Sequence, residues 1–304
     1  ESAERTIPAG SQVVLNVAKT LADGARIKPP GSVGVVMEAP PHHHDPYVIR
    51  FADGQTVQAT GSELSLRRRE VDDELIQPPE KLRDYVFYQC QVGSKAFGLA
   101  DESSDDDLRG IYLPPAELHW SMYRLPEQLE FDQGDQDEVY WELEKFLKLA
   151  LKANPSILET LWTPLVLQSN EIAEELRDLR EAFLSKHVYK TYSGYALSQF
   201  RRMANAYEKT QRYKPKHAMH LIRLMRSGIF ALQTGEIRID VGEHREDLLR
   251  VKAGELSFEE VRAEAHRLIE EFQAAFESTQ LPDQPDFARA DDFLIRSRRK
   301  MTDA

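Results

Sequence analysis

The chain has 304 residues, with 51 acidic and 39 basic side chains and a formal net charge of −12 at pH 7. This length allows a sizeable core and about two domains, while the acidic balance argues against nonspecific coating of nucleic acid. No apolar run is long enough to cross a bilayer. The single cysteine, Cys90, excludes an internal disulfide and favours a reducing cytoplasm. We therefore expect a cytoplasmic globular protein with no membrane partner.

Residues 1–75 have the pattern of a small all-β module. Short apolar runs at 13–15, 33–36, 47–51 and 56–57 alternate with Gly, Pro and Asp-Gly turn signals. Ala52-Asp53-Gly54-Gln55 predicts a hairpin between the last two runs. A five-strand SH3-like barrel fits this length. The charged stretch 67–79 is the expected linker to a second domain at 76–304.

The stretch from Gly93 to Gly110, GSKAFGLADESSDDDLRG, carries the clearest chemical pattern. A hydrophobic run at 85–91 precedes it and a second run at 111–113 follows it, so the order is strand, glycine turn, connection and strand. Strand geometry places Asp105 and Asp107 on one face, where they can share cations. Paired carboxylates beside a turn with free backbone N–H groups suit a magnesium–triphosphate complex. The alternative is a solvated acidic loop.

This stretch resembles the nucleotidyltransferase motif of the DNA polymerase β superfamily, in which Gly-Ser and a later glycine are followed by Ser-Asp-x-Asp. The downstream chain is similar to a bacterial and phage branch of predicted nucleotidyltransferases that includes RNA-ligase-associated members. The similar segments are 142–146, 154–155, 216–224, 235–236, 248–249 and 254–255. The resemblance covers about residues 80 to 300. It implies an α+β fold, with a polymerase-β-like sheet core at 76–150 and a helical region at 151–304.

The resemblance implies an NTP-dependent enzyme that moves an NMP group to an acceptor hydroxyl and releases pyrophosphate. Two Mg²⁺ or Mn²⁺ ions per site would stabilise the attacking and leaving oxygens. Asp105 and Asp107 are the expected bridging ligands. A third carboxylate is expected on a neighbouring strand, and the family spacing of about eight residues before Lys145 selects Asp137. Glu142 is the alternative.

The nucleotide-binding residues are expected in two places. Gly93 and Ser94 would let the backbone approach the β- and γ-phosphates. Lys216, His220 and Arg223 fall at i, i+4 and i+7, which is one stripe of a helix that could neutralise a triphosphate. A plain turn and a solvated basic face are the respective structural alternatives.

The rest of the second domain has helical periodicity. Apolar residues recur at spacings of three and four over 169–186, 218–232 and 258–276. Ser257 and Glu260 form the pattern of a reciprocal N-cap at the start of the last helix. Ser193-Gly194-Tyr195 is also similar to the family, and Tyr195 can either approach a base or pack in the core.

Residues 199–226 form a basic segment in this acidic chain. They include eight cationic side chains and one acidic side chain, Glu208, so the local charge is +7. With the family's association with RNA repair, this segment makes an RNA 3′ end the leading acceptor. The alternatives are nucleotidylation of a protein or small molecule, and a non-catalytic nucleic-acid-binding protein on the same fold. The preferred NTP, ATP included, and the oligomeric state are left open.

Overall fold

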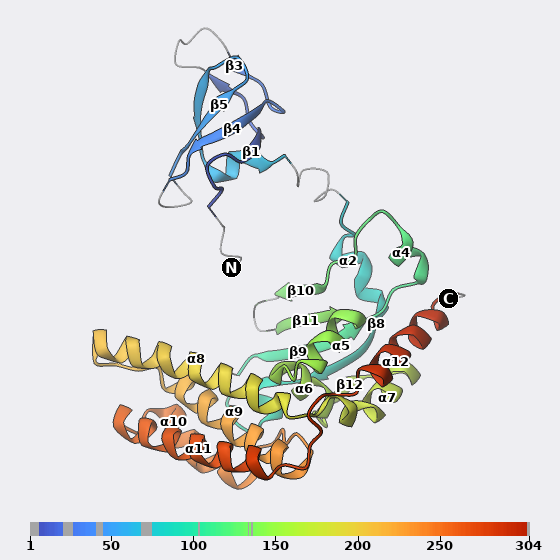
Figure 1. The fold of residues 1–304 in the computed structure, drawn as a ribbon, viewed down its shortest axis with the longest axis vertical. Helices are drawn as coiled ribbons and strands as arrows, with labels where there is room; N and C mark the ends of the chain where they lie inside the picture. Colours follow the sequence, from blue (N-terminus) through green and yellow to red (C-terminus); the bar gives the residue numbers. More distant parts are fainter. Residues whose placement is uncertain are drawn as a thin grey trace. The chain divides into compact units, whose positions relative to one another are not determined.

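A computed structural model describes residues 6–20, 27–40, 45–67, 75–102, 104–132, 134 and 136–302 (Figure 1). The chain divides into two compact units, residues 1–76 and 77–304. Most of the expected linker, residues 68–74, lies outside the described residues. Across the described ranges, no helix has both the length and the apolar character needed to cross a bilayer.

The first unit is built on a five-stranded antiparallel sheet with the strand order β6-β5-β4-β1-β7. The predicted hairpin is confirmed, because β5 pairs with β6 across a turn in which Gly54 has a φ of +82°. The strands are β1 (Gln12–Leu15), β2 (Lys19–Thr20), β3 (Ile27–Lys28), β4 (Val33–Glu38), β5 (Tyr47–Phe51), β6 (Thr56–Ala59) and β7 (Leu64–Leu66). Val13, Val36 and Ile49 belong to a separate hydrophobic core.

The predicted SH3-like closure of this unit is not confirmed. Strands β6 and β7 are the two edges of the sheet, and the described residues give no pairing between them. Among the described residues, strands β2 and β3 pair with each other and with no further strand. The short apolar runs therefore predicted the strands, whereas closure depends on edge-to-edge hydrogen bonds that a single sequence does not specify.

The second unit combines a mixed sheet with helices, as the α+β expectation requires. The strand order is β10-β11-β9-β8-β12; β9 and β11 are parallel, and the other pairs of neighbouring strands in this described sheet are antiparallel. The strands are β8 (Val86–Gln91), β9 (Asp106–Tyr112), β10 (Gln128–Asp132), β11 (Gln136–Glu142) and β12 (Val166–Gln168). Gly110 is required in β9, because a Cβ atom there would collide with the Tyr88 backbone of β8.

The helices pack around this sheet and around one another (Figure 1). Those up to residue 178 are α2 (Pro79–Leu82), α3 (Gly93–Ala96), α4 (Ala116–Trp120), α5 (Leu143–Leu151), α6 (Pro155–Trp162) and α7 (Glu171–Asp178). The later ones are α8 (His187–Thr210), α9 (Pro215–Thr234), α10 (Arg245–Ala253), α11 (Phe258–Ser278) and α12 (Phe287–Lys300). Helix α9 packs against α8, α10 and α11, so its inner face is almost wholly buried.

Two of the three helical predictions match single helices. The pattern at 218–232 corresponds to α9, and the pattern at 258–276 corresponds to α11, whose Ser257–Glu260 capping box is confirmed. The pattern at 169–186 is divided between α7 and a 3₁₀ turn at Arg180–Phe183. Helix α12 returns to the sheet, where Arg298 bonds Glu142 and Glu144.

Candidate functional site

The two central strands bring Asp107 and Asp137 together. Strands β9 and β11 run parallel in register, and Asp107 lies directly opposite Asp137. Asp105 lies just before β9 begins. Burial raises the pKa of Asp107; Arg109 and Lys216 oppose this rise, while the charges of Asp137 and Asp105 add to it. The three predicted carboxylates therefore share one electrostatic environment, and Lys216 of α9 reaches it as well.

Arg109 is the residue of this site that the sequence interpretation missed. One of its terminal nitrogens lies 2.8 Å from Asp137 Oδ2 and 3.6 Å from Asp107 Oδ1. The other donates to the backbone oxygens of Leu108 and Asp137, each at 2.8 Å. The sequence could have indicated Arg109, because it lies two residues after Asp107 on the same strand and strand alternation puts both side chains on one face.

The carboxylate oxygens suit a hard divalent cation, although Arg109 is paired with those of Asp107 and Asp137. Carboxylate oxygens are the ligands that Mg²⁺ prefers, and Asp107 and Asp137 already share one positive group. In the described part of the chain, no three His, Cys, Asp or Glu side chains converge closely enough to hold a metal ion. The residues therefore fit a metal chemically, and its binding would require Arg109 to release Asp137.

Gly93 is positioned against Asp107, in the group of Asp105, Asp107 and Asp137 that is called the carboxylate edge below. Its φ of +69° is in the left-handed region, and a Cβ atom there would collide with the Asp107 carboxylate. Ser94 follows at the start of α3. The loop after α3 is held by the helical region, because Arg245 Nε donates to the Gly98 oxygen at 2.8 Å and Lys252 lies 2.6 Å from Asp101.

Glu142, the alternative third carboxylate, lies at the other end of β11. Five residues of strand separate it from Asp137, which is about 16 Å. Its carboxylate accepts from the Glu144 and Lys145 backbone N–H groups as the N-cap of α5, and Arg298 lies 3.2 Å away. This arrangement gives Glu142 a structural role and leaves Asp137 beside Asp107.

The predicted cationic stripe separates into three different environments. Lys216 is exposed and acts on Asp107. Burial, together with the Arg223 and Lys216 charges, lowers the pKa of His220 to about 4, so His220 is neutral at pH 7. Arg223 is buried, lies 2.7 Å from Glu159, and places its guanidinium 3.6 Å from the Phe97 ring centroid. Only Lys216 therefore offers the free positive charge that the spacing implied.

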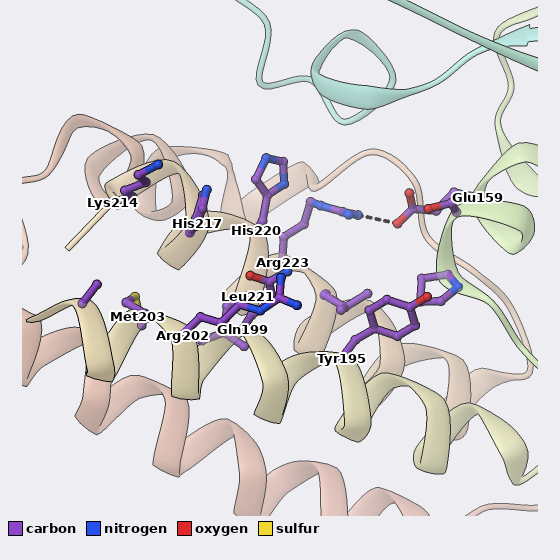
Figure 2. A pocket seen from close by; sticks show the side chains of 14 residues that line it. Glu159, Tyr195, Gln199, Arg202, Met203, Lys214, His217, His220, Leu221 and Arg223 are labelled. Carbon is purple, nitrogen blue, oxygen red and sulfur yellow. Dashed lines mark hydrogen bonds and ion pairs between the residues drawn. The ribbon is translucent and has the colours of Figure 1, made fainter. Parts of the chain in front are cut away.

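A cavity of about 540 Å³ lies between α6, α8 and α9 (Figure 2). Tyr195, Gln199 and Arg202 of α8 lie across from His217 and His220 of α9, and the Glu159–Arg223 pair closes one end. The remaining lining residues are Pro155, Ser156, Met203, Ala206, Lys214, Leu221 and Leu224. Since Arg223 also covers Phe97, the residue that follows α3, this cavity adjoins the loop next to the carboxylates.

Residues 68–296 match the model of the RlaP family, the RNA repair pathway DNA polymerase beta family. The chain belongs to this family. The match includes the carboxylates of β9 and β11, Gly93 and Ser94, and the cavity between α6, α8 and α9, and it leaves out most of the first β unit. The family assignment therefore concerns chiefly the second unit.

Relatives of this RlaP-family chain carry no assigned activity in their names. The uncharacterized protein YcgL of Bacillus subtilis is 31% identical over 159 residues, which are 51% of this chain and 60% of that protein. The uncharacterized protein MJ0002 of Methanocaldococcus jannaschii is 28% identical over 157 residues, 50% of this chain and 63% of its own length. The chain thus spans less than two thirds of either relative.

One solved structure is also similar at low level. It is the nucleotidyltransferase-like protein from Exiguobacterium sibiricum, with 11% identity, a TM-score of 0.28, and coverage of 77% of this chain and 78% of its own. A likeness this weak adds nothing to the family assignment, which rests on the family model.

Proposed function

We propose that this protein is an NTP-dependent nucleotidyltransferase that moves an NMP group to the 3′ hydroxyl of an RNA and releases pyrophosphate. The observation that carries the proposal is the pairing of Asp107 with Asp137 in register on adjacent parallel strands. Gly93 supports it, because a backbone without a Cβ at this point leaves room for the carboxylate of Asp107 and for a phosphate group.

In this proposal Asp105, Asp107 and Asp137 would hold two Mg²⁺ or Mn²⁺ ions. Bound there, the ions would stabilise charge on the attacking and leaving oxygens. Asp137, once Arg109 has released it, would accept the proton of the attacking hydroxyl. Gly93 and Ser94 would offer backbone N–H groups to the terminal phosphates, and Lys216 would add the nearest free positive charge.

The RNA acceptor is supported by two observations. The family is described by its place in an RNA repair pathway. The basic segment, residues 199–226, also places exposed cations at one end of the helical region, and cations of this kind bind a phosphate backbone.

The test is to incubate the protein with each NTP, Mg²⁺ or Mn²⁺, and a pool of RNAs, and to score extension by one nucleotide. The double variant Asp105→Ala with Asp107→Ala should abolish transfer while the far-ultraviolet circular dichroism spectrum stays unchanged. Transfer that survives this double change would contradict the site assignment. Transfer to protein in place of RNA would contradict the acceptor.

A further inference from the structure

The cavity between α6, α8 and α9 has a lining that suits one nucleotide unit. Tyr195 is 45% exposed and offers a ring face for a base, with the Gln199 amide one turn along α8. Met203, Leu221 and Leu224 supply an apolar surface. A base needs this combination of an aromatic face, apolar contact and a side-chain amide.

Two exposed cations at the same cavity have no carboxylate partner among the described residues, unlike Arg223, which is paired with Glu159. Arg202 and Lys214 line the cavity, and within the described ranges neither forms an ion pair. Four further exposed cations of the basic segment share this property, namely Arg201, Lys209, Arg212 and Lys216. In a chain of net charge −12, such a group is positioned to bind an external anion.

The spread of these cations favours a strand over a single triphosphate. Arg202 and Lys209 are seven residues apart on α8, which is about 10 Å along one face of the helix. A row of this length suits consecutive phosphates of a single strand. Lys216 links this row electrostatically to the carboxylate edge, because its charge lowers the pKa of Asp107.

We propose that this cavity binds the 3′-terminal nucleotide of a single-stranded RNA, with the base on Tyr195 and the preceding phosphates on Arg202, Lys214 and their neighbours. The inference rests on the proposed function, since it places the acceptor beside the carboxylates. It assigns the incoming NTP to the Gly93 loop and the acceptor to the cavity. Each site then takes one of the two substrates.

The experiment measures binding without catalysis. A 5′-fluorescein-labelled single-stranded RNA is titrated by anisotropy without NTP, with divalent ions chelated, against the wild type and Arg202→Glu with Lys214→Glu. We expect an affinity loss of at least about tenfold, and a salt-dependence slope smaller by about 1.4, because two phosphate contacts are lost. Tyr195→Ala should weaken binding roughly five- to hundredfold, whereas Tyr195→Phe should not.

The matched control is Lys190→Glu with Arg299→Glu. It changes the charge equally at two exposed cations outside the cavity, of which Lys190 is on the same helix. We expect this control to bind RNA as the wild type does. An equal loss in both double variants, or no binding by the wild type, would overturn the proposal.

Two further measurements separate the end of the RNA from other ligands. A circular RNA of the same sequence should bind more weakly than the linear form, and equal binding would overturn the terminal assignment. NTP affinity should be unchanged by Arg202→Glu with Lys214→Glu, and its loss in place of RNA affinity would overturn the acceptor role. The Asp105→Ala, Asp107→Ala variant should keep RNA affinity. Absent nucleotide transfer with intact cavity-dependent RNA binding would therefore count against the proposed function alone.

Discussion

The carboxylate edge and the basic segment differ in how their charged side chains are paired. At the carboxylate edge, Arg109 holds Asp137, and nearby Lys95 lies 2.6 Å from Asp106. In the basic segment, exposed cations such as Arg202 and Lys214 have no ion-pair partner within the described ranges. Ion pairs fix the side-chain positions at the first region before any substrate binds. At the second region the unpaired side chains can adopt the positions that a ligand requires.

Two buried or half-buried residues of the basic segment offer no free charge. The Arg223 guanidinium is paired with Glu159 in the interior, and burial keeps His220 in its neutral form. Substitutions at four residues test this difference in charge pairing.

The largest effect is expected at Asp137. Asp137→Asn should lower the rate of nucleotide transfer by about 10²- to 10⁴-fold, because an amide cannot accept the proton of the attacking hydroxyl. The control is Asp132→Asn on β10, the exposed carboxylate directly across from Asp137, which should retain most of the activity. Equal losses in the two variants, measured with labelled NTP, would remove the special role of Asp137.

The second effect is on stability and concerns the buried ion pair. Arg223→Met should lower the free energy of unfolding by about 3–5 kcal/mol, because it leaves Glu159 buried without its partner. Glu159→Met combined with Arg223→Met should recover much of this loss. Lys148→Met, which breaks an exposed pair with Glu144, should cost no more than about 1 kcal/mol. Urea unfolding measures all three, and a single variant as stable as wild type would refute the structural role.

The third effect depends on pH and concerns His220. The pKa of His220 is lowered by burial to about 4, whereas an unfolded chain has the ordinary value near 6.5. Unfolding therefore takes up a proton between these values, so stability falls as the pH drops from 6.5 to 4, by about 3 kcal/mol for this group. His220→Gln should remove this part of the fall in the free energy of unfolding, measured by urea unfolding at a series of pH values.

His119 offers the comparison for that measurement. Burial also lowers its pKa to about 4, and it lies on α4 away from the cavity. His119→Gln should remove a similar share of the decline without changing RNA affinity. A pH profile unchanged in the His220→Gln protein would show that burial does not hold this residue neutral.

The smallest effect is expected at Arg109. Arg109→Gln removes a positive charge from Asp107 and Asp137, so the free protein should bind Mg²⁺ or Mn²⁺ about tenfold more tightly, an effect of roughly 1.4 kcal/mol. Calorimetry with the metal alone measures this. Lys95→Gln, which removes the partner of Asp106, is the control and should leave metal affinity nearly unchanged. Weaker metal binding by Arg109→Gln would mean that the arginine prepares the carboxylates for the ion.

The sequence predicted the elements that depend on local patterns. The hydrophobic run at 85–91 predicted β8, and the Ser257–Glu260 pattern predicted the start of α11. The family spacing selected Asp137, and the structure places it opposite Asp107. These features depend on residues close in sequence or on a motif of fixed spacing, so one chain is enough to recognise them.

The sequence did not predict features that depend on distant partners. Helical spacing put Lys216, His220 and Arg223 on one stripe, but the partner of Arg223 is Glu159, 64 residues away. The burial of His220 likewise comes from packing between helices. Helix α8, which forms one wall of the cavity, was not predicted either, because its mixed polar and apolar face has weak periodicity. Charge state is set by tertiary contacts that spacing does not encode.

The return of α12 to the sheet has a consequence for how the protein folds. Arg298 bonds Glu142 across a sequence separation of 156 residues, and the Ala116 N–H donates to the Met301 oxygen at 3.0 Å. Contacts of such long range slow folding, because loop closure must precede the gain from packing. During synthesis, the carboxylate that caps α5 therefore lacks its arginine until 156 further residues have been added after Glu142. The sheet and the helix that follows it cannot make these contacts before α12 has been synthesised.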